Sequence, residues 1–296
     1  MKHCGISFSL LFLMSCTAQQ PKVIIKKSEN KNTLLWQVSG KNIKQPSFLF
    51  GTFHLLCKED IHFSEPLVTA IKASHEIYME LDMDDPSALF GGLAFINMKD
   101  GKNLRELYSA SDYIKIERYF KDTLHIPLGM FQKIKPYFLV AMLYPRMMNC
   151  STPSGVEEEL IKIAKDNKKE IQGFETVAFQ ASVFDSIPYA WQAKELMKNI
   201  DSFQFYKKQL DTMVMAYSHQ QIDQMTAELG KSEFGSNAYE DLLLTNRNLN
   251  WLAKLKTIMV GESVFVAVGA GHLLGEKGMI RLLQKEGYNV EPVNNR

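Results

Sequence analysis

Apolar positions along the chain fall into two alternating patterns, short runs and longer helical repeats. Short runs rich in β-branched or aromatic residues and bounded by turn residues predict strands over 34–40, 47–53, 76–82, 169–175, 263–269 and 288–293. Helical periodicity predicts helices over 86–98, 103–123, 136–148, 155–168, 176–186, 189–229, 237–259 and 275–286. A further helix is predicted from Ser64, whose hydroxyl can cap it. Strands near both ends of the chain, with helices between them, indicate an α/β fold with a large helical insertion.

The first strands and helix also predict how the sheet is built. The order strand, helix, strand over residues 47–82 is the building block of a parallel sheet. With 296 residues, of which 46% are hydrophobic, the chain can bury a sizeable core, and one large domain over 33–296 is favoured over two smaller ones. We therefore expect a central, mostly parallel sheet.

Charge and motif content exclude several classes of function. The 34 basic and 33 acidic residues leave a net charge of +1, and no stretch combines clustered Lys and Arg with aromatic residues. A nucleic-acid partner is therefore not expected. The HExxH, GxSxG and Walker A motifs are absent, and the glycines of "GAGHLLG" lack the spacing of a dinucleotide-binding loop.

The N-terminus has the pattern of an export signal. A basic start and an apolar stretch over residues 1–15 are too short to span a bilayer and precede Cys16. Leu13-Met14-Ser15-Cys16 resembles a bacterial lipobox, in which Cys16 is lipidated, although an ordinary cleaved signal is the alternative. Residues 16–32 then form a polar tether. These features predict an exported lipoprotein held at the cell envelope by its lipid anchor.

Two cysteines remain in the predicted domain. Cys57 and Cys150 would lie in an oxidising compartment, where an even pair suggests a disulfide. Two buried free thiols are the alternative.

Two matched glycine-histidine motifs are the main candidates for chemistry. "GTFH" ends at His54 and "GAGH" ends at His272, and each follows a predicted buried strand. The glycines leave room for a sharp turn, so both imidazoles can reach the edge of the sheet where α/β proteins bind ligands. Two imidazoles and a carboxylate could hold a metal ion. Glu80 and Glu175 end predicted strands and are candidates for that carboxylate, and Asp82 competes with Glu80.

A single histidine after a strand is more often a satisfied polar residue than a ligand, and Glu80 could simply cap a helix or pair with a base. The matched placement of two histidines favours the metal hypothesis.

These motifs resemble the TraB/GumN family, which includes the TIKI proteases. The resemblance extends to "YMELD" at 78–82, to "PSGVEEELIKIAKDNKKEIQGFETVAFQ" at 153–180 and to "TNRNLNWLAKL" at 245–255, and it covers roughly residues 34–293. It implies a fold like the EreA/ChaN group, with a central sheet from two related halves, a helical insertion and a site between the halves.

The same resemblance implies roles for individual residues. It points to His54, Glu80 and His272 in metal-dependent proteolysis, with Arg247 as a ligand for an anion or a transition state. It places three more side chains in the same cleft, namely Glu157, Glu175 and Gln180.

The leading functional hypothesis is an envelope-anchored, metal-dependent hydrolase that acts on peptides and uses Mn²⁺, Co²⁺ or Zn²⁺. Glu80 would serve as the third ligand or as the general base. A binding lipoprotein that captures a peptide or haem is the alternative from another class, and hydrolysis of a small molecule is a third. The sequence leaves the substrate, the metal and the oligomeric state open.

Overall fold

A six-stranded sheet forms the centre of the protein. The computed structural model describes residues 25–29, 31–86, 91–231 and 239–296. The strand order is β6-β4-β7-β2-β1-β8, with bounds β1 (Leu35–Ser39), β2 (Ser47–Thr52), β4 (Glu76–Leu81), β6 (Ile171–Glu175), β7 (Val264–Gly269) and β8 (Asn289–Pro292). Strands β6, β4, β7 and β2 are mutually parallel, and β1 runs antiparallel to both β2 and β8. The predicted α/β fold with a mostly parallel sheet is confirmed.

The two strands that carry the glycine-histidine motifs are neighbours in the sheet. β2 pairs in parallel with β7, so that Phe48 lies beside Phe265 and Thr52 beside Gly269. All six residues of β2 are buried, as the continuous apolar run predicted. Because the residues of β2 and β7 pair with the same offset along the whole contact, the two motifs leave the sheet side by side at its carboxyl edge.

Helices pack on the sheet through large apolar side chains. On α11 (Asn246–Gly261), Trp251 stacks on Phe174 of β6, which in turn contacts Tyr78 of β4. Helices α1 (Glu65–Ala73), α6 (Val156–Asp166) and α12 (Met279–Lys285) contribute buried residues to the same core. The Ser64 hydroxyl caps α1 by accepting a hydrogen bond from the Leu67 amide, as expected.

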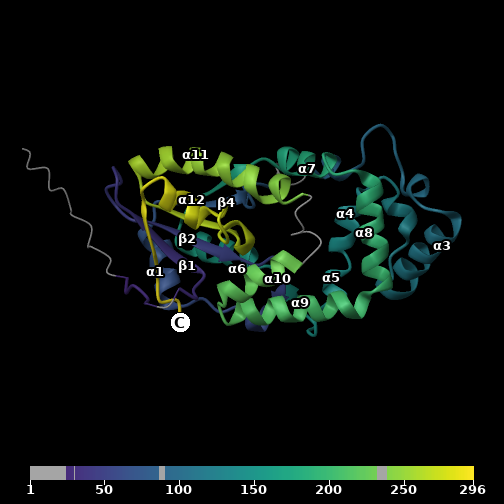
Figure 1. Cartoon of the computed structure of the whole chain (residues 1–296), viewed down its shortest axis with the longest axis horizontal. Helices are drawn as coiled ribbons and strands as arrows, with labels where there is room; N and C mark the ends of the chain where they lie inside the picture. The colour runs from purple at the N-terminus through teal and green to yellow at the C-terminus, as the bar shows by residue number, and fades with distance from the viewer. Residues whose placement is uncertain (1–24, 30, 87–90, 232–238) are drawn as a thin grey trace, which may run out of the picture.

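The helical insertion has a core of its own at the other end of the molecule (Figure 1). Its helices are α3 (Ala110–Tyr119), α4 (Pro136–Ala141), α5 (Tyr144–Met147), α7 (Val177–Asp185) and α8 (Tyr189–Asp201). Lys135, which has no exposed surface, donates hydrogen bonds to the carbonyls of Phe95 and Ala181 and pairs with Asp185 at 2.9 Å. This buried lysine ties α4 to α7.

Several predicted helices are shorter than the sequence pattern suggested. Residues 189–229 form α8, α9 (Phe203–Ser218) and α10 (Ile222–Lys231) rather than one continuous segment. Gln220 adopts a left-handed conformation between α9 and α10, with its side chain bonded to the Leu34 amide at 3.1 Å and the Asn295 carbonyl at 2.6 Å. Tertiary hydrogen bonds therefore override the helical periodicity here.

Other predicted helices differ from the structure in where they begin or where they divide. The predicted helix 103–123 begins with a 3-10 turn and becomes α3 at residue 110, 136–148 divides into α4 and α5, and 275–286 begins only at residue 279. The predicted helix 237–259 starts as α11 at residue 246 after a π-helical turn over Asp241–Thr245, and its positions 237–238 lie outside the described residues. In the predicted helix 86–98, residues 87–90 lie outside the described residues, and residues 93–96 form a 3-10 turn.

The predicted export signal and Cys16 also lie outside the described residues. The end of the expected tether runs beside the C-terminus, where Lys27 pairs with Val293 and the Ser28 amide donates to the Pro292 carbonyl at 2.9 Å. Within the described residues, no helix has both the length and the apolar character needed to cross a membrane.

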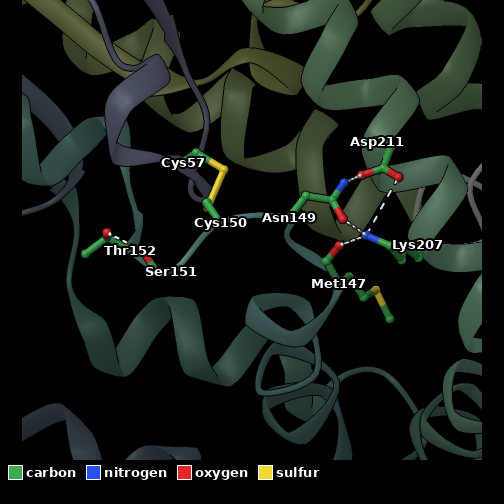
Figure 2. The surroundings of a disulfide bond; sticks show 8 residues. All are labelled: Cys57, Met147, Asn149, Cys150, Ser151, Thr152, Lys207 and Asp211. Carbon is green, nitrogen blue, oxygen red and sulfur yellow. Dashed lines mark hydrogen bonds and ion pairs between the residues drawn. A yellow bond between two sulfur atoms is a disulfide. The ribbon is translucent and has the colours of Figure 1, made fainter.

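A disulfide joins Cys57 to Cys150, with the two α-carbons 5.7 Å apart (Figure 2). Cys57 ends β3 (Leu56–Cys57), which pairs with β5 (Pro153–Ser154) just after Cys150. Lys207 of α9 holds the preceding segment through the Met147 carbonyl and the Asn149 side chain. The predicted disulfide is confirmed, and it links the segment that follows β2 to the segment between α5 and β5.

Candidate active site at the carboxyl edge of the sheet

His272 is buried at the end of β7 in a fixed orientation. A 3-10 turn over Ala270–His272 turns its ring under α11, where the ring packs on Trp251 with 4.3 Å between centroids. The Asn248 amide donates to the carbonyls of His272 and Lys277, so its oxygen faces His272 Nδ1 at 2.7 Å. Nδ1 therefore carries the proton, and Nε2 keeps its lone pair. Burial lowers the pKa of His272 to about 3, so the ring is neutral at pH 7.

Arg247 uses all its N–H groups within this cluster. Nε and Nη2 bind the buried carboxylate of Glu175, and Nη2 also donates to Glu80 Oε2 at 2.7 Å. Nη1 donates to the Leu243 carbonyl and to His272 Nε2, both at 3.1 Å. A guanidinium has five N–H groups, so an anion could bind Arg247 only if one of these contacts were released.

Glu80 stays ionised although only 13% of its side chain is exposed. Its Oε1 accepts from the Gly269 amide at 2.9 Å, and its Oε2 accepts from Gln180 at 3.2 Å as well as from Arg247. Burial raises the pKa of the carboxyl, but the neighbouring His272, Arg247 and His54 outweigh burial and lower the pKa to about 2. A carboxylate with so low a pKa is a weak proton acceptor.

His54 stands on the open side of the same edge. Its Nδ1 lies 2.8 Å from Glu157 Oε1, with 74% of the His54 side chain exposed and 8% of the Glu157 side chain. The contact with Glu157 raises the pKa of His54 to about 9. Burial raises the pKa of Glu157, but the contact with His54 prevails and lowers it. Solvent reaches the imidazole and screens its attraction to the carboxylate.

The β3–β5 ladder brings His54 and Glu157 together. The Val156 amide donates to the Phe53 carbonyl at 3.0 Å, one residue before Glu157 and one before His54. At the other end of the ladder, Cys57 lies opposite Pro153, beside the disulfide. A short backbone ladder closed by a covalent bond therefore positions the first histidine.

Gly269 lies at the point where the three predicted ligands meet. A methyl group at Gly269 would lie 3.1 Å from Glu80 Oε1, 3.7 Å from His54 Nε2 and 3.8 Å from His272 Cδ2. Gly51 leaves room of another kind, because a methyl group there would lie 3.0 Å from the Ala270 methyl. Neither glycine has a positive φ, so both provide close approach and not the sharp turn expected from the sequence.

The chemistry of these donors fits a divalent cation. In both histidines Nδ1 faces an outer acceptor, which leaves Nε2 for an ion, as is usual for metal-binding histidines. The raised pKa of His54 leaves this imidazole charged near pH 7, so an ion at its Nε2 would have to displace a proton. Three carboxylates in the cluster, Glu80, Glu157 and Glu175, would favour the added positive charge.

Two features separate this cluster from a closed metal site. His272 Nε2 lies 3.8 Å from Glu80 Oε1, and the lone pair of this nitrogen accepts a hydrogen bond from Arg247. In the described part of the chain, the compact group with ligand spacing is Cys57, Glu59 and Cys150, and its two cysteines are joined in the disulfide.

The structure thus brings the seven residues predicted from the sequence to one edge of the sheet. Hydrogen bonds and ion pairs join five of them, namely Glu80, Glu175, Gln180, Arg247 and His272. The His54–Glu157 pair approaches these five at Gly269. Asp82, the alternative to Glu80, bonds with Asp84 instead. The sequence analysis missed Asn248, which orients His272, and Trp251, which donates to Glu175 at 2.9 Å. Both adjoin Arg247 on the same helix, at positions one and four residues further on, so helical spacing could have indicated Trp251.

This fold and cluster define an α/β protein with a helical insertion and a histidine-carboxylate-arginine site at the carboxyl edge of its sheet. The chain belongs to the TraB/PrgY/gumN family, which it matches over residues 34–292.

Among curated relatives, the chain is 20% identical to metalloprotease TIKI2 of Danio rerio over 93% of its own length and 63% of the relative's. It is also 20% identical to metalloprotease TIKI1 of Xenopus tropicalis, over 90% of its length and 62% of that protein. The chain therefore spans less than two thirds of the length of these relatives. No solved structure matches it.

Proposed function

We propose that this protein is a metal-dependent peptidase whose centre lies around Gly269. The observation that carries the proposal is the convergence of His54 Nε2, Glu80 Oε1 and the His272 ring on the single position that a side chain at Gly269 would fill. The distant relatives described as metalloproteases support the same chemistry.

His54, Glu80 and His272 would hold the ion, and the low pKa of Glu80 favours a ligand over a general base. Such an ion lowers the pKa of a bound water and polarises a carbonyl group. Mn²⁺, Co²⁺ and Zn²⁺ are the candidates, because imidazole and carboxylate ligands suit all three.

Arg247 would exchange one contact when the ion binds. Its hold on Glu175 and on the Leu243 carbonyl keeps the guanidinium in place when Nη1 leaves His272 Nε2. The released N–H would then face the site and stabilise the oxyanion that develops during attack on a peptide carbonyl. With this change of hydrogen-bond partner, Arg247 would take the role of transition-state ligand that the family resemblance implies.

The test is cleavage of a defined peptide library by the purified protein in Mn²⁺, Co²⁺ or Zn²⁺, analysed by mass spectrometry. Cleavage is expected with one of these ions and is expected to vanish in His54→Ala and in His272→Ala. His219→Ala is the matched control. This exposed histidine lies at the C-terminal end of α9, where its Nδ1 is 2.8 Å from the Met215 carbonyl. Cleavage that survives both site variants would remove the proposal, and binding of peptides without cleavage would indicate a peptide-capturing protein instead.

We further propose that Cys16 carries a lipid that anchors the protein to the bacterial envelope. The lipobox-like residues before Cys16 support this proposal. Incorporation of labelled palmitate into the full chain in a bacterial host is expected, with Cys16→Ala as the control. Equal labelling of both forms, or of neither, would contradict it.

A further inference from the structure

A cavity lies against the loop that carries His54. It has a volume of about 310 Å³ and opens to solvent. Its apolar lining comes from the core residues Leu34, Phe50, Leu56, Val156 and Tyr217 and from the half-buried Ile61 and Phe63. Cavities of roughly 300 Å³ are at the small end of known ligand pockets, a size that suits one side chain and not an extended ligand.

The cavity lies next to two segments that carry residues of the candidate active site. Leu56 lines the cavity and is two residues from His54, while Val156 lines it and precedes Glu157. Tyr217 forms a third link, because its ring contacts Phe53 and its hydroxyl donates to the Gly51 carbonyl at 2.9 Å. The cavity therefore adjoins the loop that carries the first histidine.

Three of the polar residues that line the cavity bind one another. Gln220 and Asn295 exchange hydrogen bonds, and the Asn295 side-chain oxygen also accepts from Ser64. A polar ligand group placed against these three residues would lose its water without gaining matching partners. Asp60, His62, Ser218 and Arg296 also line the cavity, but most of its surface is apolar. The lining thus favours an apolar guest.

We infer that this cavity is a specificity subsite, which binds a bulky apolar or aromatic side chain of a peptide whose backbone lies across the His54 loop. The inference rests on the proposed function for its substrate class, although the binding of the side chain can be measured without catalysis.

Ile61→Trp tests the inference by filling the cavity from its half-buried wall. Ile161→Trp is the matched control, because Ile161 is also half-buried against the core but lies outside the cavity. Titration with N-acetyl-phenylalanine amide, followed by NMR without added metal, is expected to shift the Leu56 and Val156 signals in the parent and the control and not in Ile61→Trp. Absence of such shifts in the parent would overturn the inference.

Cleavage of the peptide library gives the second readout. The parent is expected to favour Phe over Ala at one substrate position, and Ile61→Trp to reduce this preference at least about tenfold. Phe63→Ala, which enlarges the cavity, is expected to shift the preference toward Trp. Cleavage with an unchanged preference in both variants would overturn the subsite, whereas probe binding without cleavage would support the subsite and remove the proposed peptidase function.

Discussion

Glu157 Oε1 lies 2.8 Å from Nδ1 of His54, although His54 follows β2 and Glu157 lies far along the chain, in the first turn of α6. The carboxylate holds one nitrogen of the imidazole and leaves Nε2 directed at the point above Gly269. Asn248 holds Nδ1 of His272 from another helix, while Nε2 of His272 accepts from Arg247. Each histidine of the paired motifs thus has an outer partner that selects the nitrogen available for a ligand.

Glu157→Gln removes the carboxylate while keeping the shape of the side chain. We expect the affinity of the protein for its divalent ion to fall by about 10- to 100-fold, because the neutral amide oxygen is a weaker acceptor than the carboxylate that orients the imidazole. Calorimetric titration measures this change. Glu159→Gln, which removes an ion pair with Lys162 on the same helix, serves as the control and should bind like the parent.

Gly269→Ala fills the proposed metal position without removing any ligand. Its methyl group would lie 3.1 Å from Glu80 Oε1, so we expect loss of ion binding in a protein that still folds. Gly271→Ala, whose methyl group would meet its nearest atom at 3.5 Å, should retain binding. Normal ion binding by Gly269→Ala would place the ion elsewhere.

The buried, neutral His272 should make the protein sensitive to acid. In the unfolded chain this imidazole takes up a proton near pH 6.5, whereas in the folded protein burial lowers its pKa to about 3. Between these values the unfolded state binds the extra proton, so the free energy of unfolding falls as the pH falls, by up to about 1.4 kcal/mol per pH unit. Below about pH 3 both states are protonated and this loss stops increasing.

Urea denaturation of the parent and of His272→Gln between pH 7 and pH 4.5 isolates this contribution. The difference in the free energy of unfolding between the two proteins should become smaller as the pH falls. A difference that stays constant over this range would show that His272 does not remain neutral in the folded protein.

The disulfide should stabilise both the fold and the His54–Glu157 pair. Replacing Cys57 and Cys150 together by alanine is expected to lower the free energy of unfolding by about 2–5 kcal/mol, because the bond closes a long loop in the unfolded chain. Dithiothreitol should destabilise the parent by a similar amount and leave the double variant unchanged. Equal stability of the oxidised parent and the variant would contradict this role.

The sequence predicted most of the site because its residues sit at the ends of recognisable strands. Buried apolar runs located the strands that precede His54, Glu80 and His272, and parallel strands deliver their ends to one edge. Strand order and the contact between β2 and β7 could not be read from these runs, since they depend on packing across the whole chain. Glu157 and Arg247 entered through the family resemblance, and their partners became visible only in three dimensions.

Helix ends were less predictable for a physical reason that Gln220 illustrates. Its side chain bonds the Leu34 amide and the C-terminal segment, and these distant contacts stabilise a left-handed residue within a helical pattern. Local periodicity carries no information on such partners. Local periodicity also does not reveal the π-helical turn over Asp241–Thr245, after which α11 begins later than its apolar pattern predicts.

The most direct test of the account is the metal content and affinity of residues 25–296, measured by elemental analysis and calorimetry beside a His54→Ala/His272→Ala double variant. We expect one Mn²⁺, Co²⁺ or Zn²⁺ ion per chain in the parent and none in the variant. A parent that binds none of these ions, or a variant that binds as well as the parent, would contradict it.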